Sequence, residues 1–244
     1  MAIHIAESPD KWSHTLAGWI TDYIVLILSN RDRFTLALPG GNTPKVLYQL
    51  LASSPYREKI DWSRMHLFCG DERDVPFSDD RSNAKMVFDT LLSRVIVPAA
   101  QIHMIRTDLD PQDAALQYES ILHGYFPAVE SPASWATFDL VLLGMGEDGH
   151  TLSLFPGTAV LNEQQLWVSA FYLDAQQMYR VTLTRAVVNL ASRIAFLATG
   201  SGKAQTLKAV LQGPYLPERY PSQLIQPVHG ELHWFVDRAA ASAL

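Results

Sequence analysis

The sequence is poor in cysteine, with a single one, Cys69, among 244 residues. No intrachain disulfide can form, and this composition fits a reducing compartment. Cys69 lies inside an apolar run, where a cysteine behaves as a small apolar side chain. We therefore expect it to be part of the core rather than a nucleophile.

Targeting signals and membrane-length apolar runs are also missing near the N-terminus. The apolar stretch at residues 23–28 is six residues long, whereas a helix that spans a bilayer takes about 20. Residues 1–30 have neither the basic start nor the small-residue cleavage site of a secretory signal. These features predict a cytoplasmic protein without a membrane partner, in which residues 23–28 belong to a buried helix.

A concentrated basic surface is missing as well. The formal net charge is −6, and lysine and arginine form no cluster along the chain. Since nucleic-acid binding needs a basic patch or stripe, we expect no nucleic-acid partner. An anionic ligand would have to be held by a few well-placed cations.

Two catalytic sequence patterns are absent. No histidine pair shows the His-Glu-x-x-His arrangement of zinc proteases. The Gly-x-Ser-x-Gly elbow of many serine hydrolases does not occur either. We expect no catalytic metal.

What the sequence does contain is one recurring local pattern: a short apolar run, then glycine with polar residues, then a helical segment. The apolar runs are residues 34–38, 65–69, 138–143 and 194–198. Strands that are apolar on both faces and alternate with helices indicate an α/β fold, a mostly parallel sheet covered on both sides. We also expect a strand at residues 232–236 and helices at 11–29, 45–52, 82–94, 111–127, 185–191 and from 203 to about 211.

The polar loops that follow these four runs are expected to meet. Right-handed crossovers put the strand-to-helix loops of such a sheet at the same edge, and ligands bind there, outside the carboxyl ends of the strands. The loops are residues 39–44, 70–74, 144–150 and 199–203. Together they predict one site.

The loop at residues 39–44 has the composition of an anion-binding turn. Gly40 and Gly41 allow the backbone to approach a ligand, Pro44 suits a first helical turn, and Thr43 is a candidate cap. The free N–H groups and the dipole of the following helix favour a phosphate. A plain tight turn before a capped helix explains the same residues, so both interpretations stay open.

Four charges, Asp71, Glu72, Arg73 and Asp74, directly follow the second run. Burying charge is costly unless it is paired or used. A structural network of arginine and carboxylates is one interpretation, and the position at the end of a strand favours a functional one. The Ser82-Asn83 pair that follows could equally be a simple helix start.

Residues 144–149 match the Gly-x-Gly-x-x-Gly pattern of dinucleotide sites. The match falls in mid-chain, Pro156 limits any helix after it, and no acidic strand end follows at the usual spacing, so we regard it as weak. More distinctive is Asp148-Gly149-His150. An imidazole held close to a carboxylate can accept a proton at neutral pH.

The loop at residues 200–203 superficially resembles the end of a phosphate-binding Walker sequence, but it lacks the first glycine and the final Ser/Thr. A lysine at a glycine turn, Lys203, still suits a single phosphate group. Arg180 is a possible second cation, and the alternative for it is an ordinary arginine on a strand surface.

Taken in order, the motifs PGGNTP, GDERDVP with a following SN, GMGEDGHTLSLFP, YRVTLT and TGSGK resemble those of the 6-phosphogluconolactonase family, over residues 34 to 203. The resemblance implies a three-layer α/β/α sandwich with a Rossmann-like sheet, as one domain over residues 1–244. Asn42 stands where a serine is common, and Leu152 where an alanine is common.

The same superfamily includes glucosamine-6-phosphate deaminases, which carry a glutamate shortly after the histidine. The matching stretch here, residues 153–156, has no acid. Arg73 also stands where the deaminases typically have tyrosine. Both differences favour the lactonase branch.

The resemblance implies that the chain hydrolyses 6-phospho-D-glucono-1,5-lactone without a cofactor. The sequence does not show the oligomeric state, and we expect a monomer. His150 is then the general base, Asp148 or Asp71 orients its imidazole, and Arg73 contacts the oxyanion or the sugar hydroxyls. The residues expected to hold the phosphate are Gly40, Gly41, Asn42, Thr43, Arg180 and Lys203. Alternatives are an amino-sugar phosphate deaminase, a catalytically silent sugar-phosphate-binding protein and, last, a nicotinamide-dependent oxidoreductase.

Overall fold

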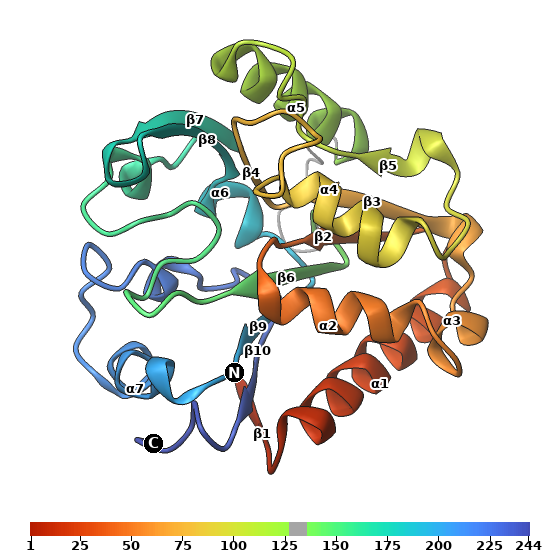
Figure 1. Cartoon of the computed structure of the whole chain (residues 1–244), viewed down its shortest axis with the longest axis horizontal. Coiled ribbons are helices and arrows are strands. Elements are labelled where there is room, and N and C mark those ends of the chain that lie inside the picture. Colours follow the sequence, from red (N-terminus) through yellow and green to blue (C-terminus); the bar gives the residue numbers. More distant parts are fainter. Residues whose placement is uncertain (127–135) are drawn as a thin grey trace.

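The computed structural model describes residues 1–126 and 136–244 and is built around a seven-stranded sheet (Figure 1). Every neighbouring pair of strands in this sheet is parallel, which confirms the predicted α/β class. The strands, in spatial order, are β1 (Ala2–Ala6), β10 (Glu231–Asp237), β9 (Arg193–Ala198), β6 (Leu140–Gly144), β2 (Phe34–Leu38), β3 (Met65–Cys69) and β5 (Ile102–His103).

Helices cover both faces of the sheet, as the sequence predicted. One face packs against α1 (Pro9–Leu28), α2 (Asn42–Leu51) and the π-helical turn Phe88–Leu92 that continues α4 (Asn83–Val87). The other face packs against α5 (Pro111–Tyr125), α6 (Arg185–Val188) and α7 (Ala204–Gln212). In the described part of the chain, the remaining short helices are α3 (Tyr56–Lys59) and the 3-10 turns Trp62–Arg64, Ala99–Gln101, Ala159–Asn162, Asp174–Gln176, Ser201–Lys203 and Pro221–Leu224.

Successive side chains along each central strand point alternately into the two helical layers. In β6, Val141 and Leu143 belong to the core under α5, whereas Leu140 and Leu142 belong to the core under α1. All four side chains are fully buried. Since burying such a side chain contributes about 1.5–3 kcal/mol, a run that is apolar at every position stabilises both layers at once.

A second, three-stranded antiparallel sheet was not predicted. Its order is β4 (Asp71–Arg73), β8 (Met178–Leu183) and β7 (Val168–Leu173). The chain leaves the main sheet at Gly70 and pairs at once with β8. The charged residues that we expected in a loop therefore form a short strand.

Several helix boundaries differ from the predictions. α2 begins at Asn42 rather than at residue 45, and its N-cap is Gly41, so the expectation of Thr43 as the cap is wrong. α6 ends at Val188, earlier than predicted. The predicted helix at 111–127 extends in the structure to Tyr125, and residue 127 lies outside the described part of the chain.

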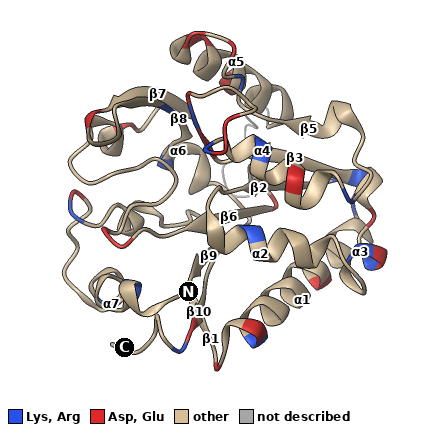
Figure 2. Cartoon of the chain, viewed as in Figure 1, with Lys and Arg blue, Asp and Glu red and all other residues tan. Residues whose placement is uncertain are grey.

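Charged residues of both signs are spread over the helical layers (Figure 2). Within residues 1–126 and 136–244, no helix is both long enough and apolar enough to cross a membrane.

Four adjacent strands, β9, β6, β2 and β3, form the middle of the main sheet. These are the strands that precede the four polar loops. Because all four run in the same direction, their loops emerge side by side at one edge, and the site is built there.

Candidate active site

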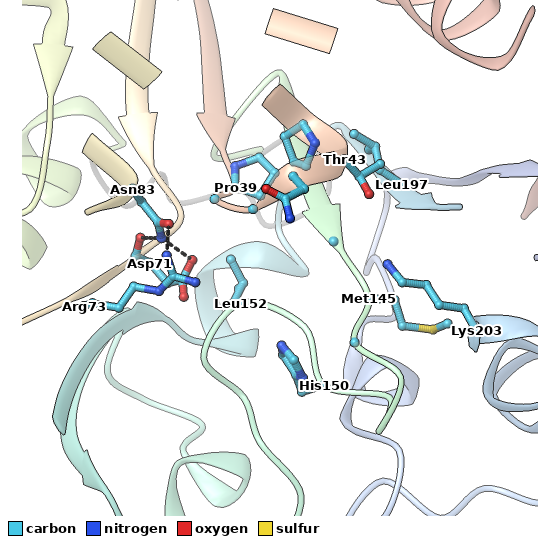
Figure 3. A pocket seen from close by; sticks show the side chains of 16 residues that line it. Pro39, Thr43, Asp71, Arg73, Asn83, Met145, His150, Leu152, Leu197 and Lys203 are labelled. Carbon is cyan, nitrogen blue, oxygen red and sulfur yellow. Dashed lines mark hydrogen bonds between the residues drawn. The ribbon is translucent and has the colours of Figure 1, made fainter. Parts of the chain in front are cut away.

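A cavity of about 180 Å³ lies at this edge of the sheet. In Figure 3, Lys203 and Met145 stand on one side of it, Asp71, Arg73 and Asn83 stand on the opposite side, and His150 lies between them. Its lining comes from all four loops and from three further residues, Asn83, Leu152 and Leu197. The loop residues in the lining are Pro39, Gly40, Gly41, Asn42, Thr43, Pro44, Asp71, Arg73, Gly144, Met145, Gly146, His150 and Lys203.

The start of α2 contributes an anion-binding backbone to the cavity. Gly41 has a positive φ of 102°, which suits glycine, and no side chain of the described residues caps the helix. The first N–H groups of α2 thus have no side-chain partner within residues 1–126 and 136–244, and the helix dipole adds partial positive charge there. Thr43 Oγ1 lies 3.3 Å from Thr199 Oγ1, so the first and last loops are in direct contact. This end of the cavity is suited to a phosphate.

Lys203 supplies a cation to the same end. Its ammonium points into the cavity (Figure 3) and has no hydrogen-bond or ion-pair partner among the described residues. Burial lowers the pKa of Lys203 below its ordinary value, while Glu147 and Asp237 act in the opposite direction. Asp237 also accepts a hydrogen bond from the Gly200 N–H at 3.1 Å, which fixes the turn that carries the lysine.

His150 and Asp148 form a hydrogen-bonded pair at the end of β6. Asp148 Oδ1 lies 2.6 Å from His150 Nδ1, and it also accepts from the His150 backbone N–H at 3.1 Å. Burial acts to raise the pKa of Asp148, but the hydrogen bonds from His150 outweigh it and leave the pKa below its ordinary value. With Nδ1 bound to the carboxylate, Nε2 is left as the proton acceptor.

The loop that carries this pair is tightly folded. Gly146 N–H donates to His150 O at 2.9 Å, and Gly149 N–H donates to Gly146 O at 3.1 Å. Gly149 has a positive φ of 82°. Ser222 then holds the loop from outside, since its N–H and its Oγ both donate to Gly149 O. The imidazole is therefore held by a rigid backbone.

Gly146→Ala is expected to lower kcat at least about 10-fold, because a β-carbon there would lie 2.2 Å from His150 Nδ1 and 2.5 Å from Asp148 Oδ1. The pair would have to move. Steady-state kinetics and a melting curve check this, with Gly18→Ala in α1 as control, where a β-carbon meets nothing within 4 Å. Normal turnover in Gly146→Ala would show that the position of the pair does not matter.

Phe155 packs against His150, and Arg180 packs against Phe155. The rings of His150 and Phe155 are stacked with centroids 4.2 Å apart, and the Arg180 guanidinium lies 5.8 Å from the centroid of Phe155. Arg180 is 3% exposed, donates to Gln176 Oε1 and has no carboxylate partner in the described part of the chain. Burial lowers its pKa to about 10, against the attraction of Asp71.

The charges that follow β3 divide into two roles. Asp71 lines the cavity and accepts from Ser153 Oγ at 2.6 Å, so the structure places it with Ser153 rather than with His150. Glu72, at 1% exposed, points away into the protein, and burial raises its pKa while backbone hydrogen bonds lower it. Arg73 lines the cavity and forms no ion pair among the described residues.

The structure thus brings together in one cavity every predicted site residue except two. Asp148 lies behind His150, and Arg180 is buried outside the lining. Sequence reasoning missed the second layer, Ser153 and Phe155, because nothing in their local sequence marks it. Asn83 was noticed only as a candidate helix start, and it also lines the cavity.

Three features define the class of protein: the parallel sheet, the start of α2 with Lys203 in the same cavity, and the His150–Asp148 pair. Together they describe an α/β protein whose cavity is suited to a small phosphorylated molecule and to proton transfer beside it. A family model described as "Glucosamine-6-phosphate isomerases/6-phosphogluconolactonase" matches residues 7–234. The chain belongs to this family.

Individual relatives point to one branch of the family. The 6-phosphogluconolactonase of Synechocystis sp. is 38% identical over 226 residues, which cover 92% of this chain and 90% of the relative. That of Haemophilus influenzae is 37% identical over 209 residues, covering 86% and 87%. The solved structure of 6-phosphogluconolactonase from Trypanosoma brucei is 27% identical, with a TM-score of 0.86 and coverage of 100% of this chain and 98% of that chain.

Proposed function

We propose that the protein hydrolyses 6-phospho-D-glucono-1,5-lactone to 6-phospho-D-gluconate, a step of the oxidative pentose phosphate pathway, without a cofactor. The observation that carries this proposal is the His150–Asp148 pair. Among the described residues, the Nε2 of His150 and the ammonium of Lys203 have no hydrogen-bond partner, and both residues line one cavity with the start of α2. The relatives named 6-phosphogluconolactonase support the choice of substrate.

The phosphate would bind between the start of α2 and Lys203. Backbone N–H groups from Gly41 to Thr43 and the ammonium would supply its hydrogen bonds. This anchor would fix the distance from the phosphate to the lactone ring and direct the ring toward His150 and Asp71, which line the same cavity (Figure 3). A direct contact of Arg180 with the phosphate stays a prediction.

The chemical step needs one base and good positioning. His150 Nε2 takes a proton from a water molecule, whose oxygen attacks the lactone carbonyl. When the tetrahedral intermediate collapses, the bond from the carbonyl carbon to the ring oxygen breaks, and the imidazolium returns the proton to that oxygen. Asp148 keeps the imidazole oriented and stabilises its charged form, as the carboxylate of a catalytic triad does. Arg73 would contact the developing oxyanion or the sugar hydroxyls.

The competing reaction within the family is release of ammonia from glucosamine 6-phosphate. Phe155 argues against it, because an apolar ring stacks on His150 in the stretch where the deaminases carry a glutamate.

We also propose that the chain acts as a monomeric, cytoplasmic enzyme, with residues 1–244 as one domain.

The test is a panel of substrates followed by ³¹P NMR and an ammonia assay. We expect ring opening of the phosphorylated lactone and no ammonia from glucosamine 6-phosphate. Ammonia release would instead identify a deaminase. Binding of 6-phosphogluconate without turnover of either compound would identify a silent binding protein.

A further inference from the structure

Asn83, the first residue of α4, holds two side chains of β4 through its amide. Its Nδ2 donates to Asp71 O at 2.7 Å and to Asp71 Oδ1 at 3.3 Å, and its Oδ1 accepts from Arg73 Nη1 at 2.6 Å (Figure 3). Asn83 is 2% exposed, so these hydrogen bonds are shielded from bulk water. One amide therefore sets the relative positions of a carboxylate and a guanidinium that line the cavity.

The same amide touches the phosphate-binding loop. A β-carbon built on Gly40 would lie 1.8, 2.2 and 2.6 Å from Oδ1, Cγ and Nδ2 of Asn83. Gly40 does not have a positive φ, so its backbone alone does not require glycine. The close approach of the Asn83 amide is what excludes a side chain at position 40.

The backbone of Asn83 is held by the buried carboxylate of Glu72. Glu72 accepts from the N–H groups of Asn83 and Ala84, both at 2.7 Å, and from Ser82 Oγ at 3.1 Å. Three charge-assisted hydrogen bonds of this kind fix the start of α4 firmly. The backbone of Asn83, from which its amide projects, cannot shift without breaking them.

We propose that Asn83 is a positioning residue, which keeps the phosphate-binding loop in register with Asp71 and Arg73. The inference rests on the proposed function, because that register matters only if one ligand contacts both ends of the cavity. A small shift of the phosphate-binding loop relative to Asp71 and Arg73 should lower kcat more than it weakens substrate binding. The phosphate would still bind, but the lactone carbonyl would be misplaced.

The first experiment measures kcat, KM and melting temperature for Asn83→Ala and Asn83→Asp. In Asn83→Ala we expect kcat to fall about 10- to 100-fold, with a change in KM of less than about threefold. Asn83→Asp is expected to be at least as slow. Its second carboxylate oxygen cannot donate to Asp71 and repels it, although the pairing with Arg73 is kept. Full activity in Asn83→Asp would show that only the contact with Arg73 matters and would overturn the proposal.

Asn189→Ala is the matched control. Asn189 also bridges two segments through its amide, donating to Leu224 O at 3.0 Å and accepting from Gln226 N at 2.9 Å, but it does not line the cavity. We expect it to lower the melting temperature and to leave kcat unchanged. If both asparagine variants lose kcat only in proportion to lost stability, the role of Asn83 is merely structural.

The second experiment asks whether Gly40 and Asn83 act as a pair. Gly40→Ala alone is expected to lower both the melting temperature and kcat. Asn83→Ala removes the three atoms that the new β-carbon would strike, so the double variant should match Asn83→Ala alone. Independent, additive losses would contradict the proposed contact.

The two experiments separate this inference from the proposed function. The coupling between Gly40 and Asn83 in melting temperature is measured without any substrate, so it tests their contact directly. If the wild-type protein fails to open the lactone, the proposed function is wrong, whatever that coupling shows. If the wild type is active and the Asn83 variants keep normal kcat, only the positioning role is wrong.

Discussion

Replacing His150 with alanine is expected to lower kcat by about 10²- to 10⁴-fold, the usual contribution of a positioned general base. No other histidine in the described ranges lines the cavity, so no neighbour can take over the proton. The side chain is 30% exposed, and its removal leaves the backbone hydrogen bonds of the loop in place. KM and the melting temperature should therefore change little.

His14→Ala is the control for this substitution. His14 lies on α1 and pairs with Tyr56 far from the cavity. We expect wild-type kinetics for it. Turnover of His150→Ala within about threefold of the wild type would refute the general-base role, and the reaction would then depend on positioning alone.

The second large effect is expected for Lys203→Ala, which should raise KM for the phosphorylated lactone by about 10- to 100-fold. Hydrogen bonds that involve a charged group contribute about 1.5–3 kcal/mol, and each 1.4 kcal/mol is a factor of ten in affinity. Turnover of unphosphorylated glucono-1,5-lactone should be unchanged. Equal losses with both lactones would show that the lysine does not bind the phosphate.

Two further lysine variants sharpen this result. Lys208→Ala removes an exposed lysine of α7 and should leave KM unchanged. Lys203→Arg keeps a cation at every working pH. Because burial lowers the pKa of Lys203, its ammonium is lost at a lower pH than that of an exposed lysine. Calorimetric affinity for 6-phosphogluconate should therefore fall as the pH rises through this lowered pKa in the wild type, and not in Lys203→Arg.

The main sheet could be predicted from the sequence because its central strands are buried on both faces. The apolar runs at residues 34–38 and 194–198 show this without long-range information. The second sheet could not be predicted in the same way. β4 is three charged residues long, and only its pairing with β8 makes it a strand.

The candidate site was predictable up to the point where side-chain directions matter. Glycine-rich loops after parallel strands indicated the place, and Asp148 and Asp71 were both plausible partners of His150. Asp148 pairs with His150 inside one short motif, whereas Asp71 is held by Ser153 Oγ, 82 positions away. A contact over that separation is not encoded in any local motif.

The most direct measurement of the central claim is a coupled assay that follows 6-phosphogluconate from freshly generated 6-phosphogluconolactone. We expect a rate that exceeds spontaneous hydrolysis, increases in proportion to protein concentration and is lost in His150→Ala. A rate equal to the spontaneous one at every protein concentration would contradict the account.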